Sequence, residues 1–270
     1  MRVLVLGDIH GRTMYANHAA DIAVRVGVDT IIQVGDLGIW PGGRARDLFD
    51  KLDARLGRLG ISMLVAPGNH EDYDQIDALT PREDGWLPFR DHILLAPRGF
   101  RTTLGGRSVL WLGGAGSVDR SPRIASDAHA NERFATYGSR KRQHTWWPQE
   151  ALTDVDVERA IAGGHADIMI CHDAPENVRA IDARIVGNPH GFNRSDIAYA
   201  NESRARLTRA VKAVQPDLLV HGHFHFVVDD TFKIPFVEHE TRVIGLAADG
   251  AAGSIAILDC LALTVVQTGI

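Results

Sequence analysis

The sequence predicts a single α/β domain, and three observations lead to this class. Short apolar runs alternate with amphipathic segments from the first residues onward. Most of the apolar runs end in glycine followed by a polar residue, as in "LVLGD" and "IIQVGD". The chain has 270 residues, of which 45% are hydrophobic and 23% charged, and this is ordinary for one globular domain. Alternating strand and helix patterns predict parallel strands joined by right-handed crossovers.

The first five elements are expected in the order strand, helix, strand, helix, strand. Residues 2–8, 29–36 and 61–72 each carry a short apolar run that ends in polar residues, which indicates buried strands. Between them, residues 14–28 and 44–60 have apolar residues at helical spacing. In the second helix the apolar side is formed by Leu48, Leu52, Leu56 and Leu59.

The same alternation continues and ends in a β-rich tail. Helices are expected at 151–164, where Thr153 is in position to cap the N-terminus, and at 194–214. The tail, residues 235–269, contains three β-rich stretches separated by turn residues. Further strands are expected at 92–96, 108–116, 166–173 and 216–226.

Residues 117–148 form the least regular stretch of the sequence. This stretch is polar and rich in arginine, and it ends in Trp146 and Trp147. A long irregular segment in a compact domain is usually a functional loop or a disordered one, and the tryptophans favour a folded loop. We expect a substrate-side loop at 117–148, with a surface excursion pinned by the tryptophans as the alternative. Without repeats or a linker, one domain over residues 1–270 is predicted.

Composition argues against several classes of protein. The formal net charge is −5, so no global basic field attracts nucleic acid or anionic membrane. Cys171 and Cys260 are far apart in the sequence, which disfavours a disulfide framework. No apolar stretch approaches the roughly 18 residues of a membrane span, and no signal peptide is evident. We expect a soluble, cytoplasmic protein without a membrane partner.

Polar residues of a restricted kind follow five of the expected strands. A single Asp or His at a strand end is more often a cap or a surface residue, but five such ends carry only oxygen and imidazole groups. Glycines precede most of these groups and allow the backbone to pass close to a crowded centre. The residues are Asp8, His10, Asp36, Asn69, His70, His172, His223 and His225.

These residue types indicate a metal site. Oxygen and imidazole donors without thiolate suit borderline divalent ions such as Mn²⁺, Fe²⁺ or Zn²⁺. Three Asp or Asn oxygens and four of the five imidazoles give seven ligands, which are too many for one such ion. Two ions sharing one carboxylate account for the number, and pairs about 3.5–4 Å apart occur in phosphatases and nucleases.

The motifs themselves resemble a known family. "GDIHG" (7–11), "GDLG" (35–38), "GNHED" (68–72), "CHD" (171–173) and "HGHFH" (221–225) are similar in order and spacing to the five signature blocks of calcineurin-like metallophosphoesterases. The resemblance extends from residue 7 to residue 225. It implies a four-layer α/β/β/α sandwich with mixed sheets and an active site at the C-terminal ends of the strands.

The resemblance also implies a role for each residue. Two divalent ions would be bound, Mn²⁺ first among them, with Fe²⁺ or Fe³⁺, Zn²⁺, Ni²⁺ and Co²⁺ as alternatives. A hydroxide between the ions would attack phosphorus, and His70 would protonate the leaving oxygen. Asp36 would bridge the two ions, while His221 would be a neighbour without a catalytic role. The ligands of the first ion would be Asp8, His10 and His225, and those of the second Asn69, His172 and His223.

Departures from the family pattern bear on the substrate. Protein phosphatases of this superfamily carry "GDxVDRG" and an arginine before "GNHE", whereas this chain has "GDLGIWPGG" and Pro67. The partner that orients His70 is therefore left open, with Asp72 and Asp74 nearby. A phosphodiester carries one negative charge and needs fewer arginines, which favours a phosphodiesterase over a phosphomonoesterase.

The stretch 113–150 is similar to a segment of bacterial and phage-type members, some of which hydrolyse cyclic nucleotides. We therefore expect a small-molecule phosphodiester as substrate, with a cyclic nucleotide first, and a bacterial or phage origin. Arg120 and Arg123 are candidates for substrate contacts. The alternatives are a nuclease with a basic strip at 133–144 and a non-catalytic scaffold, although scaffolds of this type lose ligands that this chain keeps.

Overall fold

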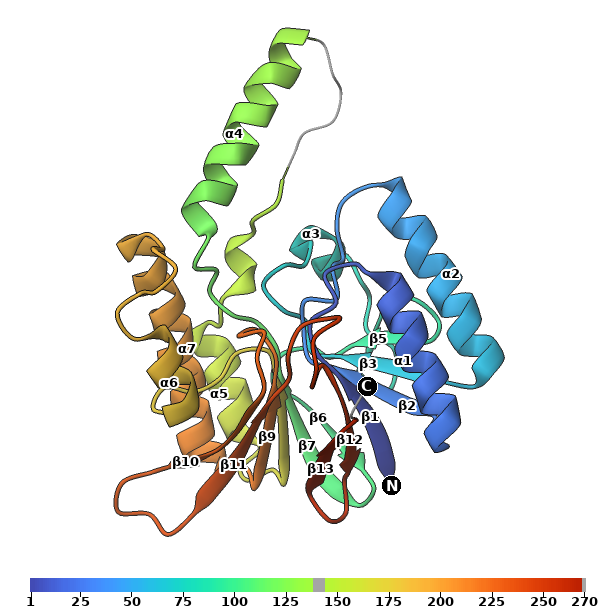
Figure 1. The fold of residues 1–270 in the computed structure, drawn as a ribbon, viewed down its shortest axis with the longest axis vertical. Helices are drawn as coiled ribbons and strands as arrows, with labels where there is room; N and C mark the ends of the chain where they lie inside the picture. Colours follow the sequence, from blue (N-terminus) through green and yellow to red (C-terminus); the bar gives the residue numbers. More distant parts are fainter. Residues whose placement is uncertain (138–143, 269–270) are drawn as a thin grey trace.

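The computed structural model describes residues 1–137 and 144–268. Its strands form two mixed sheets (Figure 1). The seven-stranded sheet has the spatial order β13 (Thr264–Gln267), β12 (Ile255–Asp259), β1 (Arg2–Leu6), β2 (Thr30–Gln33), β3 (Ser62–Val65), β5 (Ile93–Leu95) and β4 (Leu87–Pro88). The six-stranded sheet has the order β10 (Val228–Lys233), β11 (Glu240–Gly245), β9 (Leu218–His221), β8 (Ile168–Cys171), β7 (Arg107–Leu112) and β6 (Phe100–Leu104).

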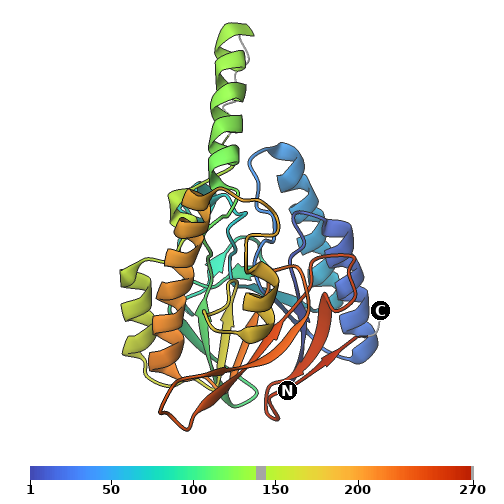
Figure 2. The ribbon, with the colours of Figure 1, turned by 60° about the vertical axis from the view of Figure 1, so that its left-hand side comes forward.

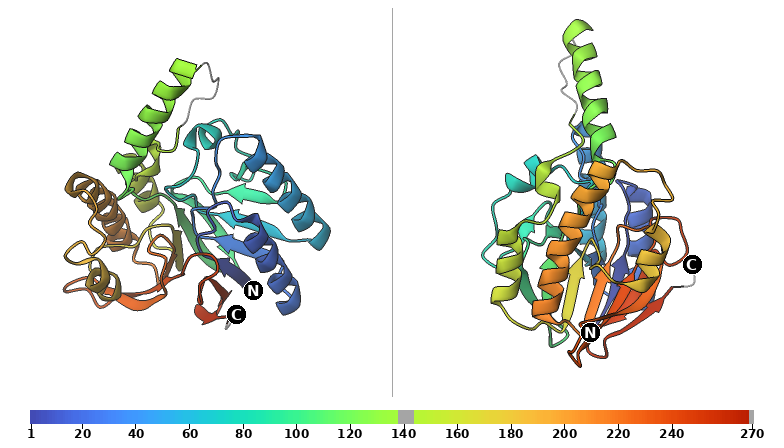
Figure 3. Two further views of the ribbon diagram at one scale, coloured as in Figure 1. Left: turned by 45° about the horizontal axis from the view of Figure 1, so that its top comes forward. Right: turned by 90° about the vertical axis from the view of Figure 1, so that its left-hand side faces the viewer.

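Helices cover the outer faces of both sheets, as Figures 1 and 2 show. α1 and α2 lie beside the seven-stranded sheet, and α5, α6 and α7 lie beside the six-stranded sheet. The right-hand view of Figure 3 looks onto the side of the molecule that α5, α6 and α7 cover. The helices are α1 (Thr13–Val26), α2 (Gly43–Leu59), α3 (Tyr73–Asp77), α4 (Arg120–Tyr137), α5 (Asp154–Ala162), α6 (Arg179–Ile185) and α7 (Arg194–Val214), with a 3₁₀ turn at Pro148–Glu150.

Three apolar cores hold these layers together. The middle core lies between the sheets and includes Val5 of β1 and Trp111 of β7. The outer cores join each sheet to its helices, one through Leu4 of β1 and the other through Leu219 of β9. Because the central strands are buried on both faces, their sequences are continuously apolar. The predicted α/β class and the four-layer α/β/β/α sandwich are confirmed.

The four helices predicted by periodicity are present. Thr153 caps α5 as expected, and it forms a capping box with Asp156. The predicted apolar side of α2 is only partly buried: Leu52 and Leu56 are buried, whereas Leu48 and Leu59 are each 37% exposed. The elements β4, β6, β10, α3 and α6 were not predicted.

Residues 117–148 are not the irregular loop that the sequence suggested, because α4 occupies Arg120–Tyr137. Residues 124–137 contain several alanines and neither glycine nor proline, which favours a helix. Pro122 lies in the first turn, where its missing N–H is tolerated. In the ribbon views α4 projects from the body of the molecule (Figures 1, 2 and 3).

The segment that follows α4 and leads back to the body of the molecule is held by hydrogen bonds to the N-terminal half of α4. The backbone N–H of Thr145 donates to Oδ2 of Asp127 over 2.7 Å, and Arg123 donates to the carbonyl of Thr145. Trp147 is 3% exposed and belongs to the outer core of the first sheet, so the predicted aromatic anchor is real. Of the basic strip at 133–144, residues 138–143 lie outside the described residues.

None of the helices in the described part of the chain is long and apolar enough to cross a membrane.

Candidate metal centre

The ends of five strands bring the predicted ligands to one edge of the sandwich. β1, β2 and β3 are parallel neighbours in the first sheet, and β8 and β9 are parallel neighbours in the second. Because the sheets pack face to face through the middle core, both sets of carboxyl ends meet at that edge. The side chains that follow these strands are Asp8, His10, Asp36, Asn69, His70, His172, His223 and His225.

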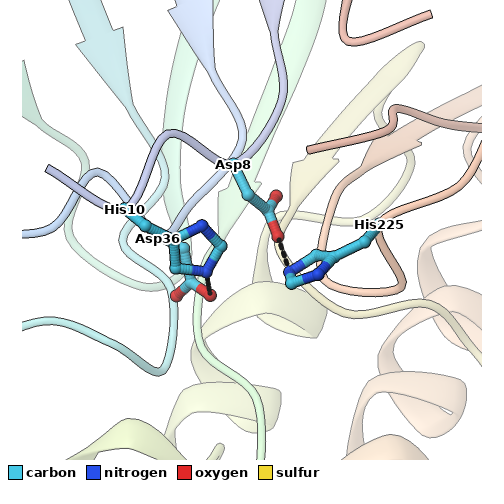
Figure 4. Close-up of side chains that lie close together, drawn as sticks. All are labelled: Asp8, His10, Asp36 and His225. Carbon is cyan, nitrogen blue, oxygen red and sulfur yellow. Dashed lines mark ion pairs between the residues drawn. The ribbon is translucent and has the colours of Figure 1, made fainter. Parts of the chain in front are cut away.

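One group in this cluster contains Asp8, His10, Asp36 and His225 (Figure 4). The ligand atoms of these four residues all lie within 4.8 Å of one another. Nε2 of His225 is 3.0 Å from Oδ2 of Asp8, and Nε2 of His10 is 3.4 Å from Oδ2 of Asp36. Two carboxylates and two imidazoles at this spacing are donors that a divalent cation can bind.

A second group forms around His172. Its Nε2 is 3.3 Å from Oδ1 of Asp36 and 3.0 Å from Oδ1 of Asn69. Its Nδ1 lies 2.8 Å from the carbonyl of Val34, which can only accept a hydrogen bond, so Nδ1 carries a hydrogen and Nε2 is the nitrogen that faces the cluster and would bind a metal after losing its proton. The ring of His223 packs 5.0 Å from that of His172. Asp36 therefore contacts both groups, the position that a bridging ligand needs.

Backbone strain is concentrated in this cluster. In the described residues nine non-glycine residues have positive φ, and four of them are predicted ligands. Their φ angles are 43° at His10, 54° at Asp36, 66° at His223 and 60° at His225. Such conformations cost of order 1–3 kcal/mol each and persist where the surroundings fix them, often at functional sites.

Two glycines allow the chain to approach the carboxylates. A Cβ on Gly68 would lie 2.2 Å from Oδ1 of Asp36, and one on Gly222 would lie 2.1 Å from Oδ1 of Asp8. Both distances are far shorter than van der Waals contact. Any side chain at Gly68 or Gly222 would therefore clash with a ligand carboxylate, so glycine is required at these positions, as the sequence suggested.

Substituting Gly222→Ala is expected to weaken metal binding by at least about tenfold, because the added methyl displaces the carboxylate of Asp8. Metal content after dialysis against Mn²⁺, measured by plasma mass spectrometry, tests this. Gly43→Ala is the matched control, since a Cβ at Gly43 would meet nothing within 4 Å. Wild-type metal content in Gly222→Ala would show that Asp8 is not held in place by this contact.

The electrostatics of the cluster favour positive charge. Burial lowers the pKa of His172, but the carboxylate of Asp36 raises it to about 10. Burial raises the pKa of Asp36, yet the imidazoles of His172 and His70 keep it well below its usual range. A buried carboxylate that stays ionised and holds a proton on its neighbour also favours the binding of a cation in place of that proton.

Glu71 was not among the predicted site residues, although it belongs to the quoted "GNHED" motif. It is fully buried and accepts backbone N–H bonds from Leu37 at 2.6 Å, Gly38 at 3.0 Å and Ile39 at 2.8 Å. Burial and the charge of Asp36 raise the pKa of Glu71 to about 7 against the effect of these donors. Glu71 thereby fixes the loop that directly follows Asp36.

A second supporting network orients Asn69. Its Nδ2 donates to Oγ of Ser117 over 2.9 Å, and Ser117 donates to the buried Glu150 over 2.8 Å. Arg123 and Trp146 complete the network with bonds to Ser117 and Glu150. Because the amide nitrogen of Asn69 is occupied, its oxygen faces His172 and the cluster.

His70 lies beside the cluster and borders the cavity. Its backbone N–H donates to Oδ1 of Asp36 over 2.8 Å. Of the two nearby carboxylates considered as its partner, Asp72 caps α3 and Asp74 is exposed. Burial lowers the pKa of His70, whereas the charges of Asp36 and then Asp119 act to raise it. Asp119 borders the same cavity as His70, and its Oδ1 lies 3.7 Å from Nη1 of Arg123.

Arg120 and Arg123, the arginines predicted to contact substrate, are both engaged within the protein. Nε of Arg120 is 3.3 Å from the buried Asp196, and its guanidinium carbon lies 4.4 Å from the ring centroid of Tyr199. Arg123 bonds to Ser117 and lies 3.7 Å from Glu150. The described residues that line the adjoining cavity include neither arginine.

That cavity has a volume of about 910 Å³ and opens directly onto the cluster. It is lined on the side of the cluster by Asp36, Asn69, His70, His223 and His225. Residues between Arg184 and Arg204 also line it, together with Phe224 and Phe226, which follow His223 and His225 in the sequence. A volume in this range accommodates a ligand the size of a nucleotide.

Fold and cluster together define an α/β sandwich protein with a site suited to divalent metal. The family model for calcineurin-like phosphoesterase matches residues 1–227. The chain belongs to the calcineurin-like phosphoesterase family, in agreement with the motif resemblance. Family membership and the cluster support a phosphoester hydrolase that binds divalent metal.

Solved structures of similar fold include TT1561 of Thermus thermophilus, with 11% sequence identity, 99% of this chain and 98% of that chain covered, and a TM-score of 0.54. An archaeal phosphodiesterase has 11% identity, full coverage of both chains and a TM-score of 0.43. A dimetal phosphatase from Danio rerio has 14% identity, 95% and 91% coverage and a TM-score of 0.45. At these identities the likeness to TT1561 shows the fold alone. No curated protein matches the chain in sequence.

Proposed function

We propose that this protein is a phosphodiesterase that uses two divalent cations to hydrolyse small-molecule phosphodiesters, with cyclic nucleotides as the first candidates. The observation that carries the proposal is the convergence of seven oxygen and imidazole donors beside a nucleotide-sized cavity. Mn²⁺ is the metal we expect from this donor set.

The residues present fit two cations. Asp36 has one carboxylate oxygen near His10 and the other near His172, so each oxygen can serve a different ion. Bound cations of this kind activate water and neutralise the charge of phosphoryl oxygens. The first ion would be held by Asp8, His10, His225 and Asp36, and the second by Asn69, His172, His223 and Asp36.

His70 is proposed as the proton donor to the leaving oxygen. It borders the cavity, it is next to the ligand Asn69, and its backbone is fixed by Asp36. Imidazole is suited to this role near neutral pH. Asp119, which borders the same cavity, is proposed to orient its ring.

The scarcity of unpaired cations supports a diester substrate. Among the described residues that line the cavity, the arginines are Arg184 and Arg204. Arg204 is buried, and its Nη2 lies 3.2 Å from Oδ1 of Asp182. With Arg120 and Arg123 also paired, Arg184 is the only arginine among the described lining residues without an ion pair, and one such cation suits the single charge of a diester better than the dianion of a monoester.

Parallel assays of metal-depleted protein supplied with Mn²⁺ test this function. We expect hydrolysis of bis-p-nitrophenyl phosphate and of a cyclic nucleotide, with kcat/KM at least about tenfold above that for p-nitrophenyl phosphate, equivalent to about 1.4 kcal/mol. Protein kept in chelator is the control and should be inactive. Preference for the monoester, or no turnover of any diester with any of the candidate metals, would contradict the proposal.

A further inference from the structure

Part of the cavity lining beside the candidate ligands is aromatic and apolar, and these residues are called the wall below. Phe192, Phe224 and Phe226 contribute rings to it, and Ile185 and Ile197 contribute aliphatic side chains. All five are partly exposed, so their surfaces are open to a ligand. Phosphate chemistry does not require such a wall, and its character must therefore relate to another part of the substrate.

Arg184 of α6 is an unusual member of this wall. Its guanidinium carbon lies 4.2 Å from the ring centroid of Phe226. The nearest acidic neighbour in the sequence, Asp182, is paired with Arg204 instead, and the described residues include no carboxylate within ion-pair distance of Arg184. A planar cation stacked on one ring keeps its other face available for a second ring.

We infer that this wall binds an aromatic ring on the substrate, so that the proposed phosphodiesterase selects diesters of nucleosides or aryl alcohols over diesters of aliphatic alcohols. The inference rests on the proposed function for the position of the phosphate. Arg184, held on Phe226, stacks on one face of the substrate ring, and Phe192 contacts the ring from the loop before α7. The phosphate lies over the candidate metal ligands, in the adjoining part of the same cavity.

Size and continuity support this arrangement. A single cavity of about 910 Å³ reaches from His223 and His225 to Arg184 and Phe192, so one ligand can touch both regions. Phe226 directly follows His225 in the sequence, which places the stacked pair one residue from a candidate ligand. Stacking of a base on an aromatic side chain is tolerant of base identity. Preference for a ring, rather than for one base, is therefore expected.

Calorimetric titration of the Mn²⁺-loaded protein with adenosine 5′-monophosphate and with ribose 5-phosphate tests the inference. The two ligands share sugar and phosphate and differ in adenine. We expect adenosine 5′-monophosphate to bind about tenfold more tightly, in line with one stacking interaction. Phe192→Ala and Arg184→Gln are each expected to reduce this ratio to about twofold while changing ribose 5-phosphate binding little. Arg184→Lys, which keeps the charge but not the planar group, should behave like Arg184→Gln.

Two matched controls separate stacking from general effects. Arg194 is an exposed arginine at the start of α7 that does not border this cavity, and Phe236 is a fully exposed phenylalanine. Arg194→Gln and Phe236→Ala should leave the ratio unchanged. Equal affinity for both ligands in the wild-type protein, or an equal loss in Arg194→Gln and Arg184→Gln, would overturn the inference. These binding results are independent of turnover, so a protein that prefers the adenine ligand yet cleaves no diester would refute the proposed function and leave the ring site standing.

Discussion

Asp36→Asn is expected to lower metal-dependent phosphodiester hydrolysis by at least about a thousandfold. Asp36 is 1% exposed, and its two oxygens face His10 and His172 in the two halves of the cluster. Asparagine offers one oxygen and no charge, so at least one cation would lose a ligand and both would lose a shared counter-charge. Since loss of a hydrogen-bond partner behind a ligand already costs about 10–100-fold, loss of a ligand common to both ions should cost more.

Turnover of bis-p-nitrophenyl phosphate and metal content, measured on the same samples, test this expectation. We expect the variant to hold fewer than two ions per chain at Mn²⁺ concentrations that saturate the wild-type protein. Asp47→Asn, on the exposed surface of α2, is the matched control and should match the wild type in both measurements. Near-normal turnover by Asp36→Asn would remove the bridging role from this residue.

The location of the cluster could be predicted from the sequence because each ligand is marked by a local pattern at the end of a strand. Asp8, Asp36 and His172 each follow a short apolar run, and parallel strands of one sheet end at a common edge. No distance between distant segments had to be known. Local patterns did not predict the four-layer order, because a run such as "LVLGD" does not reveal which sheet contains it. That order was predicted from the family resemblance.

Features that depend on packing between distant segments were missed. Asn69 meets Ser117 across a separation of 48 residues, and Ser117 meets Glu150 across 33, and no pattern in the sequence links them. Arg120 and Arg123 looked available for substrate because their partners Asp196 and Glu150 come from other elements. Arg184, in contrast, lies on a helix too short to be predicted, and only the structure places it on Phe226.

The left-handed backbone at the ligands was also beyond sequence reasoning. Asp36, His223 and His225 have positive φ although none is glycine. Isolated propensities disfavour this conformation, and surrounding contacts maintain it, such as the hydrogen bonds that the Glu71 carboxylate accepts from the backbone N–H groups of Leu37 and Ile39. Local preference and observed geometry therefore disagree at the functional site, which is where such conflicts are expected.

His70→Ala is expected to retain bound metal but to slow esters with poor leaving groups far more than esters of p-nitrophenol. The residue borders the cavity, and its ring lies 5.4 Å from that of His10, yet its side chain is not among the proposed ligands. General acid catalysis contributes about 10²–10⁴-fold when the leaving group is a poor one. The p-nitrophenolate ion leaves without a proton, so its ester should lose less than about tenfold.

The comparison is made between adenosine 3′,5′-cyclic monophosphate, whose leaving group is an alkoxide, and bis-p-nitrophenyl phosphate, with metal content measured on both proteins. His18→Ala, on the exposed side of α1, is the matched control and should change neither rate. Equal losses on the two substrates would mean that His70 positions the phosphate without transferring a proton. A large loss in kcat confined to the cyclic nucleotide, in protein with full metal content and an unchanged KM, supports proton donation by His70, because the two substrates differ in their need for a proton on the leaving oxygen.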